Sequence, residues 1–404
     1  MTKKSDAPAI RFKGFSDAWE QRKLGELALF NPKDELPQTF EYVDLESVVG
    51  TEMLSHRAEV KSSAPSRAQR LAHTGDLFYQ TVRPYQKNNY LFEKPDNNYV
   101  FSTGYAQMRP YVDGYFLLSL VQSERFVKVV LDNCTGTSYP AINANDLAEI
   151  EVAAPSDESE AQKIGTIFRS IDNLITLHQR KFEKLTNVKK SMLEKMFPQN
   201  GSSYPEIRFK GFTDPWEQRT LEDYLTVSTE KNTGNIYGRS DVLSVSGDYG
   251  IVNQIEFQGR SFAGASVLNY GVVQTGDVVY TKSPLNSNPY GIIKTNKGKP
   301  GIVSTLYAVY HPKENAFSNF IQVYFEQHSR MNNYMHPLVN KGAKNDMKVS
   351  AENALKGPVC FPSRVEQESI SAFFSALDHL ITLHQRELDH LQLLKKGMLQ
   401  QMFI

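Results

Sequence analysis

Cysteine is scarce in this sequence: its 404 residues include only Cys134 and Cys360, and neither stands in a CxxC or HxxxH pattern. So small and widely separated a pair excludes a disulfide framework and leaves no zinc site that the sequence could predict. Long apolar runs are missing too, since no stretch approaches the roughly 18 apolar residues that a membrane-spanning helix needs. No apolar segment follows the lysines near the start, so we expect no signal peptide and a cytoplasmic protein without a membrane partner.

An excess of charge of either sign is also missing, because Lys+Arg and Asp+Glu both number 45. This balance argues against a protein that coats nucleic acid through bulk charge alone. A protein that reads DNA can still be neutral overall when its acidic residues lie on faces that meet other proteins. The charge count therefore weakens the case for DNA binding without excluding it.

Motifs of catalysis are absent: the sequence has no GxxxxGK[ST], GxGxxG, GxSxG or HExxH pattern. Asn288-Pro289-Tyr290 resembles the Asn-Pro-Pro-Tyr motif of amino-methyltransferases, but it lacks one proline and no glycine-rich cofactor loop accompanies it. We therefore expect no catalytic residue, no metal site and no cofactor bound by this chain.

The dominant feature that is present is an internal duplication. IRFKGFSDAWEQRKL at residues 10–24 and IRFKGFTDPWEQRTL at residues 207–221 are identical at twelve of fifteen positions. The string LITLHQR occurs at residues 174–180 and again at residues 380–386. A repeat of this length predicts two copies of one fold.

Each copy closes with a predicted long amphipathic helix. Alternating steps of four and three residues meet apolar side chains over more than four heptads, which indicates a coiled-coil seam. The predicted seam residues are Ile164, Phe168, Ile171, Ile175, Phe182 and Leu185 in the first helix and Ile370, Phe374, Leu377, Ile381, Leu388 and Leu391 in the second. Each helix of roughly 38 residues would be about 57 Å long. We expect the two helices to pair antiparallel with each other, since either alone would expose its apolar stripe.

Four polar residues interrupt the seam at equivalent positions of the two copies. We interpret His178 and His384 as partly buried histidines rather than as a metal site or a pH switch. We expect the ammonium groups of Lys189 and Lys395 to extend into water.

The remaining sequence predicts two globular regions of mixed α/β class, with short strands bounded by turns and short helical stretches. We expect two pseudo-symmetric α/β domains separated by the two antiparallel helices. The predicted boundaries are a first domain at 1–157, a first helix at 158–197, a linker at 198–206, a second domain at 207–364 and a second helix at 365–404.

The two copies differ most in polar segments that adjoin their shared strands. Arginine, lysine, glutamine and asparagine carry the donors and acceptors that match base edges, and lysine and serine also suit phosphates. The predicted DNA-binding residues are Arg83, Tyr85, Gln86, Lys87, Asn88, Ser138 and Tyr139 in the first copy and Lys282, Asn286, Asn288, Lys341, Lys344, Asn345 and Lys348 in the second. For any one of these residues the alternative is a solvated loop side chain.

In plan and in these phrases the chain resembles the specificity subunit of type I restriction-modification systems. The resemblance covers essentially the whole chain and depends on RFKGFSDAWEQRKLGEL and RFKGFTDPWEQRTLEDY, on TGD before a tyrosine-bearing strand, and on the two LITLHQR helices. It implies two target-recognition domains that each read half of a split asymmetric site on double-stranded DNA, with the paired helices setting the spacer.

The same resemblance implies partners that supply the chemistry. Two methylation subunits would use S-adenosylmethionine, and two motor-nuclease (restriction) subunits would use ATP and Mg²⁺, whereas this chain would be non-catalytic. Two other classes stay open: a self-sufficient DNA methyltransferase or nuclease, and a coiled-coil scaffold whose globular ends bind proteins.

Overall fold

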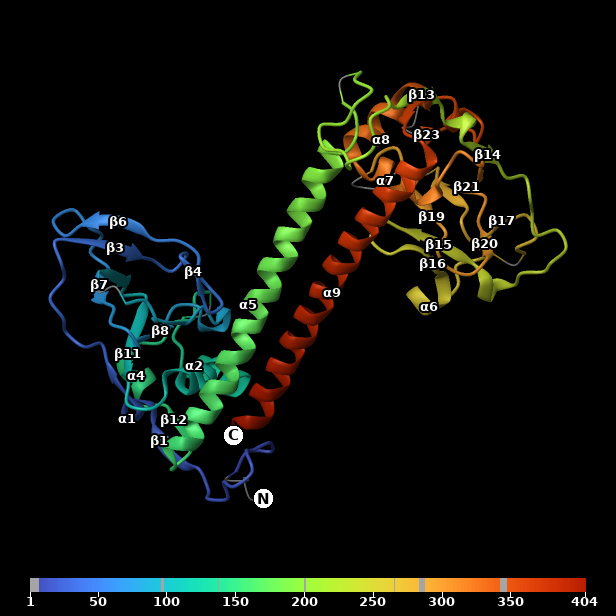
Figure 1. The fold of residues 1–404 in the computed structure, drawn as a ribbon. Coiled ribbons are helices and arrows are strands. Elements are labelled where there is room, and N and C mark those ends of the chain that lie inside the picture. The colour runs from blue at the N-terminus through green and yellow to red at the C-terminus, as the bar shows by residue number, and fades with distance from the viewer. Residues whose placement is uncertain are drawn as a thin grey trace. The chain divides into compact units, whose positions relative to one another are not determined.

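The structure is a computed structural model, which describes residues 7–95, 98–136, 138–199, 201–264, 266–282, 288–341 and 347–404. It divides into two compact units, the first formed by Met1–Arg180 with His384–Ile404 and the second by Lys181–Leu383. Both boundaries fall inside long helices, so each unit combines one globular region with a part of both helices (Figure 1). The two units are described separately below.

The long helices are α5 (Glu158–Lys195) and α9 (Arg364–Met402), green and red in Figure 1. The Asp157 carboxylate caps α5 by accepting a hydrogen bond from the Ser159 amide at 2.8 Å. Pro198 lies just beyond the end of α5, and proline disfavours helical backbone in the residue before it. Both helices thus start and stop within two residues of the positions that the sequence predicts.

In the first unit two four-stranded sheets form the frame. One sheet has the order β2-β11-β8-β9 and the other the order β6-β3-β10-β7, while β1 pairs with β12 and β4 with β5. The strands are β1 (Glu20–Lys23), β2 (Ala28–Phe30), β3 (Thr39–Val43), β4 (Val48–Val49), β5 (Glu52–Met53), β6 (Arg57–Val60), β7 (Ala68–Leu71), β8 (Leu77–Gln80), β9 (Tyr90–Leu91), β10 (Tyr99–Ser102), β11 (Tyr105–Pro110) and β12 (Glu151–Ala154). The shorter helices are α1 (Leu24–Leu27), η1 (Pro84–Gln86), α2 (Gly114–Gln122), α3 (Glu124–Asp132) and α4 (Ala144–Ala148).

The second unit repeats one of these four-stranded sheets and has two-stranded sheets in place of the other. Its four-stranded sheet has the order β14-β21-β18-β19, and the pairs β13-β24, β15-β16, β17-β20 and β22-β23 complete it. The strands are β13 (Glu217–Thr220), β14 (Leu225–Val227), β15 (Leu243–Ser246), β16 (Gly250–Asn253), β17 (Gly271–Val273), β18 (Val278–Thr281), β19 (Ile293–Thr295), β20 (Gly301–Val303), β21 (Tyr307–Pro312), β22 (Asn340–Lys341), β23 (Met347–Lys348) and β24 (Pro358–Phe361). The shorter helices are η2 (Leu221–Asp223), η3 (Arg239–Asp241), α6 (Gln254–Gln258), α7 (Ser318–Glu326), α8 (His328–Met335), η4 (His336–Leu338) and η5 (Asn353–Leu355).

The duplication seen in the sequence is therefore a duplication of topology. In β8 and β11, Tyr79 lies opposite Ala106, and in β18 and β21, Tyr280 lies opposite Ala308. The helical pairs α2–α3 and α7–α8 occupy equivalent places in the two units. The predicted fold, two α/β regions with long coiled-coil helices, is confirmed.

Contacts within each unit show that α5 and α9 run antiparallel. In the first unit the rings of Phe168 and Phe403 lie 5.9 Å apart, while His178 lies 3.1 Å from His384. In the second unit the rings of Phe197 and Phe374 lie 6.1 Å apart. In the first unit higher numbers on α5 meet lower numbers on α9, so the predicted antiparallel pairing is present.

Burial along the predicted seam is graded. The seam side chains are fully buried in the first half of each helix, up to Ile171 and Leu377, and beyond that point all except Leu388 are half-buried. The buried residues are Ile164, Phe168, Ile171, Ile370, Phe374, Leu377 and Leu388, and the half-buried residues are Ile175, Phe182, Leu185, Ile381 and Leu391. The seam is thus closed mainly where each helix packs on its own globular region.

The prediction that the two seam lysines extend into water is wrong. The Lys189 ammonium lies 2.6 Å from the Asp378 carboxylate and 2.8 Å from that of Glu326, and the Lys395 ammonium lies 2.6 Å from Asp172. Burial alone would lower the pKa of Lys189, but the two carboxylates raise it above its ordinary value. Each seam ammonium is therefore paired with a carboxylate of the other long helix, and Lys189 also with Glu326 of α7.

The repeated IRFKGF segments fasten the start of each copy to a long helix. Arg11 donates two hydrogen bonds to the fully buried Glu160 carboxylate, at 2.6 and 2.7 Å, and Arg208 donates two to Glu366, both at 2.8 Å. The amide of Ile10 donates to the Gln401 carbonyl at 3.1 Å. Residues identical in both copies therefore perform a structural task common to both.

Over the residues that the structure describes, no helix is long and apolar enough to cross a membrane. Within the same ranges no cluster of three or more His, Cys, Asp or Glu side chains could hold a metal ion.

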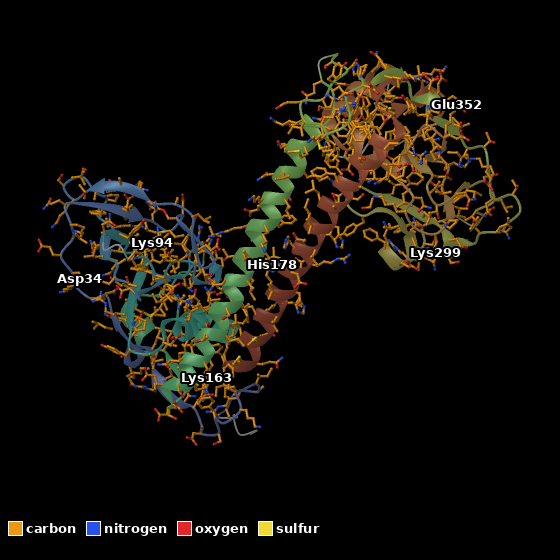
Figure 2. All side chains as sticks on the ribbon, viewed as in Figure 1. Asp34, Lys94, Lys163, His178, Lys299 and Glu352 are labelled. Atoms are coloured by element: carbon orange, nitrogen blue, oxygen red, sulfur yellow. The ribbon has the colours of Figure 1, made fainter. Side chains whose placement is uncertain are left out.

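His178 and His384 are half-buried, as interpreted from the sequence, and their Nδ1 atoms share one hydrogen bond of 3.1 Å (Figure 2 labels His178).

Candidate nucleic-acid interface

In the first unit the structure brings the two predicted DNA-binding segments together. Val82 and Ala141 form a β-bridge, and the Arg83 amide donates to the Pro140 carbonyl at 2.7 Å. The Arg83 guanidinium stacks on the Tyr139 ring at 4.4 Å from the ring centre. A cation–π contact of this kind orients the guanidinium while leaving its N–H groups free to donate.

The backbone around Arg83 is held in an uncommon conformation. Arg83 and Lys87, which flank helix η1, have φ of 54° and 57°. Left-handed backbone costs a non-glycine residue about 1–2 kcal/mol and often marks functional segments. The Gln80 side chain compensates by donating to the Val82 carbonyl at 2.6 Å and to the Gln86 amide oxygen at 2.8 Å.

The predicted residues of this segment differ in what they contact. Tyr85, Gln86, Ser138 and Tyr139 are exposed. The Lys87 ammonium, by contrast, lies 2.7 Å from the Glu124 carboxylate, and the Asn88 side-chain oxygen accepts a hydrogen bond from the Gly50 amide at 2.8 Å. Lys87 and Asn88 thus have structural partners already, and a DNA contact by either remains a prediction.

A polar pocket of about 370 Å³ lies beside these segments. Val82 and Ala141 line it, together with Arg70, a half-buried residue of β7. Arg70 was not predicted from the sequence, because AQRL reads as an ordinary strand with an outward-facing arginine. Comparison of the two copies offered one signal: Arg70 lies four residues before the TGD motif that both copies share, and the equivalent residue of the second copy is Gly271.

In the second unit fewer of the predicted residues can be placed. Lys282 is half-buried, and both burial and the nearby Lys231 ammonium lower its pKa. The Asn288 carbonyl accepts a hydrogen bond from the Gly291 amide at 3.0 Å. Lys341 and Lys348 belong to the paired strands β22 and β23. The other three predicted residues lie outside the described residues: Asn286, Lys344 and Asn345.

Comparison with known proteins finds similar sequences and a similar fold. Residues 53–187 match the model of the type I restriction modification DNA specificity domain. A putative type I restriction enzyme MjaX specificity subunit from Methanocaldococcus jannaschii is 23% identical over 305 residues, which are 70% of this chain and 66% of that protein. The chain thus spans slightly less than two thirds of that relative.

The fold comparison extends over the whole chain. The crystal structure of the type I restriction-modification system S subunit from M. genitalium superposes with a TM-score of 0.63 and 13% identity, covering 98% of this chain and 99% of that one. Residues 53–187 therefore match the DNA specificity domain of type I restriction-modification systems, and the resemblance to type I specificity subunits found in the sequence is confirmed.

Proposed function

We propose that this chain is the DNA-reading subunit of a type I restriction-modification complex and that each globular region reads one half of a split asymmetric site. The observation that carries the proposal is the convergence of Arg83 and Tyr139 in the first unit, where both lie within the matched specificity domain. A guanidinium stacked on an aromatic ring is a preorganised donor for the O6 and N7 acceptors of guanine.

Catalysis in this proposal belongs to partner subunits, two for methylation and two for restriction. S-adenosylmethionine, ATP and Mg²⁺ would be bound by those partners and not by this chain.

The duplicated LITLHQR strings support a shared docking surface, because the outward leucines are exposed alike in both copies. Leu174 and Leu177 are 43% and 45% exposed, and Leu380 and Leu383 are 40% and 43% exposed. Equivalent leucines on two helices suit two copies of one partner.

Mapping methylated adenines across a genome tests the proposal. The chain is expressed with its methylation subunits, as wild type and as Arg83→Ala. We expect the wild type to give one split motif and the variant to relax one base position in one half, since a bidentate base contact contributes about 1–3 kcal/mol, or roughly 5- to 150-fold. Arg22→Ala, which removes an exposed arginine of β1, is the control. A continuous motif, or an unchanged one in Arg83→Ala, would count against this assignment.

A second prediction concerns the spacer between the half-sites. Inserting one heptad into α5 and one into α9 keeps the seam in phase and lengthens each helix by about 10.5 Å. We expect the unread spacer to grow by about three base pairs, because B-DNA rises 3.4 Å per base pair. Both half-sites should keep their sequences. Methylation at the original spacing would refute the role of the helices as a spacer.

The zero net charge favours one other function, a scaffold whose globular regions bind proteins. A gel shift with genomic fragments at increasing salt separates the two, since phosphate contacts make DNA affinity fall steeply with salt. A self-sufficient enzyme is tested by assaying the purified chain alone with S-adenosylmethionine or with Mg²⁺. Activity of the chain alone would overturn the proposed division of labour.

A further inference from the structure

Arg70 holds an uncompensated positive charge in the pocket of the first unit. It is half-buried, it lines the pocket, and burial lowers the pKa of its guanidinium with no carboxylate contributing. Its Nε atom is buried and has no hydrogen-bond partner within the part of the chain that the structure describes. Burying an unpaired charge costs free energy. A guanidinium that has no partner within the protein is therefore expected to bind an anion that compensates its charge.

The walls of the pocket suit a polar ligand. Thr81, Thr103 and Asn133 line it, and so does Asn31, whose φ is 45°. Asp146 lies at the same pocket, where its carboxylate accepts a hydrogen bond from the Asn143 side chain at 2.5 Å. The pocket also borders the Arg83 segment through Val82, so a ligand here would be continuous with DNA that contacts Arg83 and Tyr139.

The second unit places cations at the equivalent position by other means. Alignment on the shared TGD motif sets Gly271 at the place of Arg70 and Lys282 at the place of Thr81. Lys231 forms a β-bridge with Gly271, and its charge contributes to lowering the pKa of Lys282. Glu352 acts in the opposite direction on Lys282 (Figure 2 labels Glu352). Both units thus keep positive charge at this position, although the residue types differ.

We propose that this position receives a backbone phosphate of the DNA, bound by Arg70 in the first unit and by Lys231 and Lys282 in the second. The inference rests on the proposed function of the chain. A phosphate is favoured over a base because the two units would read different sequences, whereas the backbone is the feature common to both halves. A contact that does not depend on the DNA sequence needs a positive charge but no particular residue type, and both units meet this condition.

The test measures how the affinity of the chain, complexed with its methylation subunits, for a fragment carrying the mapped site depends on salt. We expect Arg70→Gln to lower affinity about tenfold on specific and non-specific DNA alike and to reduce the slope of log K against log salt by about 0.9. The methylated motif should not change. Arg70→Lys should keep the slope, and the control Arg22→Gln should leave both slope and affinity unchanged.

The second unit provides an independent test, which still applies if the Arg70→Gln variant does not fold. The double variant Lys231→Gln/Lys282→Gln should reduce the slope by about 0.9, because both lysines bind the same phosphate. An unchanged slope in both variants would overturn the phosphate assignment, and a relaxed motif with an unchanged slope would assign the pocket to base reading instead. Thermal stabilisation of wild type by inorganic phosphate, absent in Arg70→Gln while the DNA slope stays unchanged, would assign the pocket to a free anion. A wild-type complex without any specific site would refute the proposed function itself.

Discussion

Replacing Arg11 with methionine is expected to destabilise the first unit by about 3–5 kcal/mol, because it leaves the Glu160 carboxylate charged and buried without its partner. That carboxylate is fully buried, and both of its oxygens accept hydrogen bonds from Arg11. Urea unfolding followed by tryptophan fluorescence measures the effect for one unit at a time. The sequence contains only Trp19 and Trp216, one in each unit, so a Trp216→Phe background reports the first unit alone.

Two variants make the result specific to the buried charge. Adding Glu160→Gln to Arg11→Met should restore much of the lost stability, since the unpaired charge is then gone. Arg22→Met breaks the exposed pair with Glu26 and should cost less than about 1 kcal/mol. If Arg11→Met cost no more than Arg22→Met, Arg11 would not be the residue that fastens the start of the chain to α5.

Removing residues 402–404 is expected to destabilise the first unit and not the second. Met402 and Phe403 are 2% and 5% exposed in the core that surrounds Trp19, and the rings of Phe403 and Trp19 lie 6.2 Å apart. Truncating a buried phenylalanine alone costs about 3–5 kcal/mol, so Phe403→Ala should account for most of the loss. Fluorescence of Trp19 and Trp216 in single-tryptophan backgrounds measures the two units separately.

The matched control for this truncation is Leu393→Ala on the same helix. Leu393 is 70% exposed, and its replacement should change the free energy of unfolding by no more than about 0.5 kcal/mol. Equal losses in both units after the truncation would mean that the end of α9 does not belong to the core of the first unit.

Part of the candidate site could be predicted from the sequence because two copies of one fold were available for comparison. The segments around Arg83 and Tyr139 differ between the copies next to strands that they share, and this difference identified them. Arg70 was not predicted, because the sequence of a four-residue strand does not show which of its faces borders a pocket. The ion pairs of Lys189 and Lys395 were not predicted either. The helical period places both lysines on the seam, but it does not show which carboxylates lie opposite them.

The duplicated plan, the bounds of α5 and α9 and the face on which they pair follow from the sequence, because repeats and helical periodicity are local properties of the chain. Tertiary structure alone decided that Phe403 completes the core around Trp19, that Lys395 meets Asp172 and that Arg70 lies beside the Arg83 segment. In the first two of these cases the partners are separated by more than 200 residues, and such a contact depends on how several elements pack together rather than on any pattern within one of them.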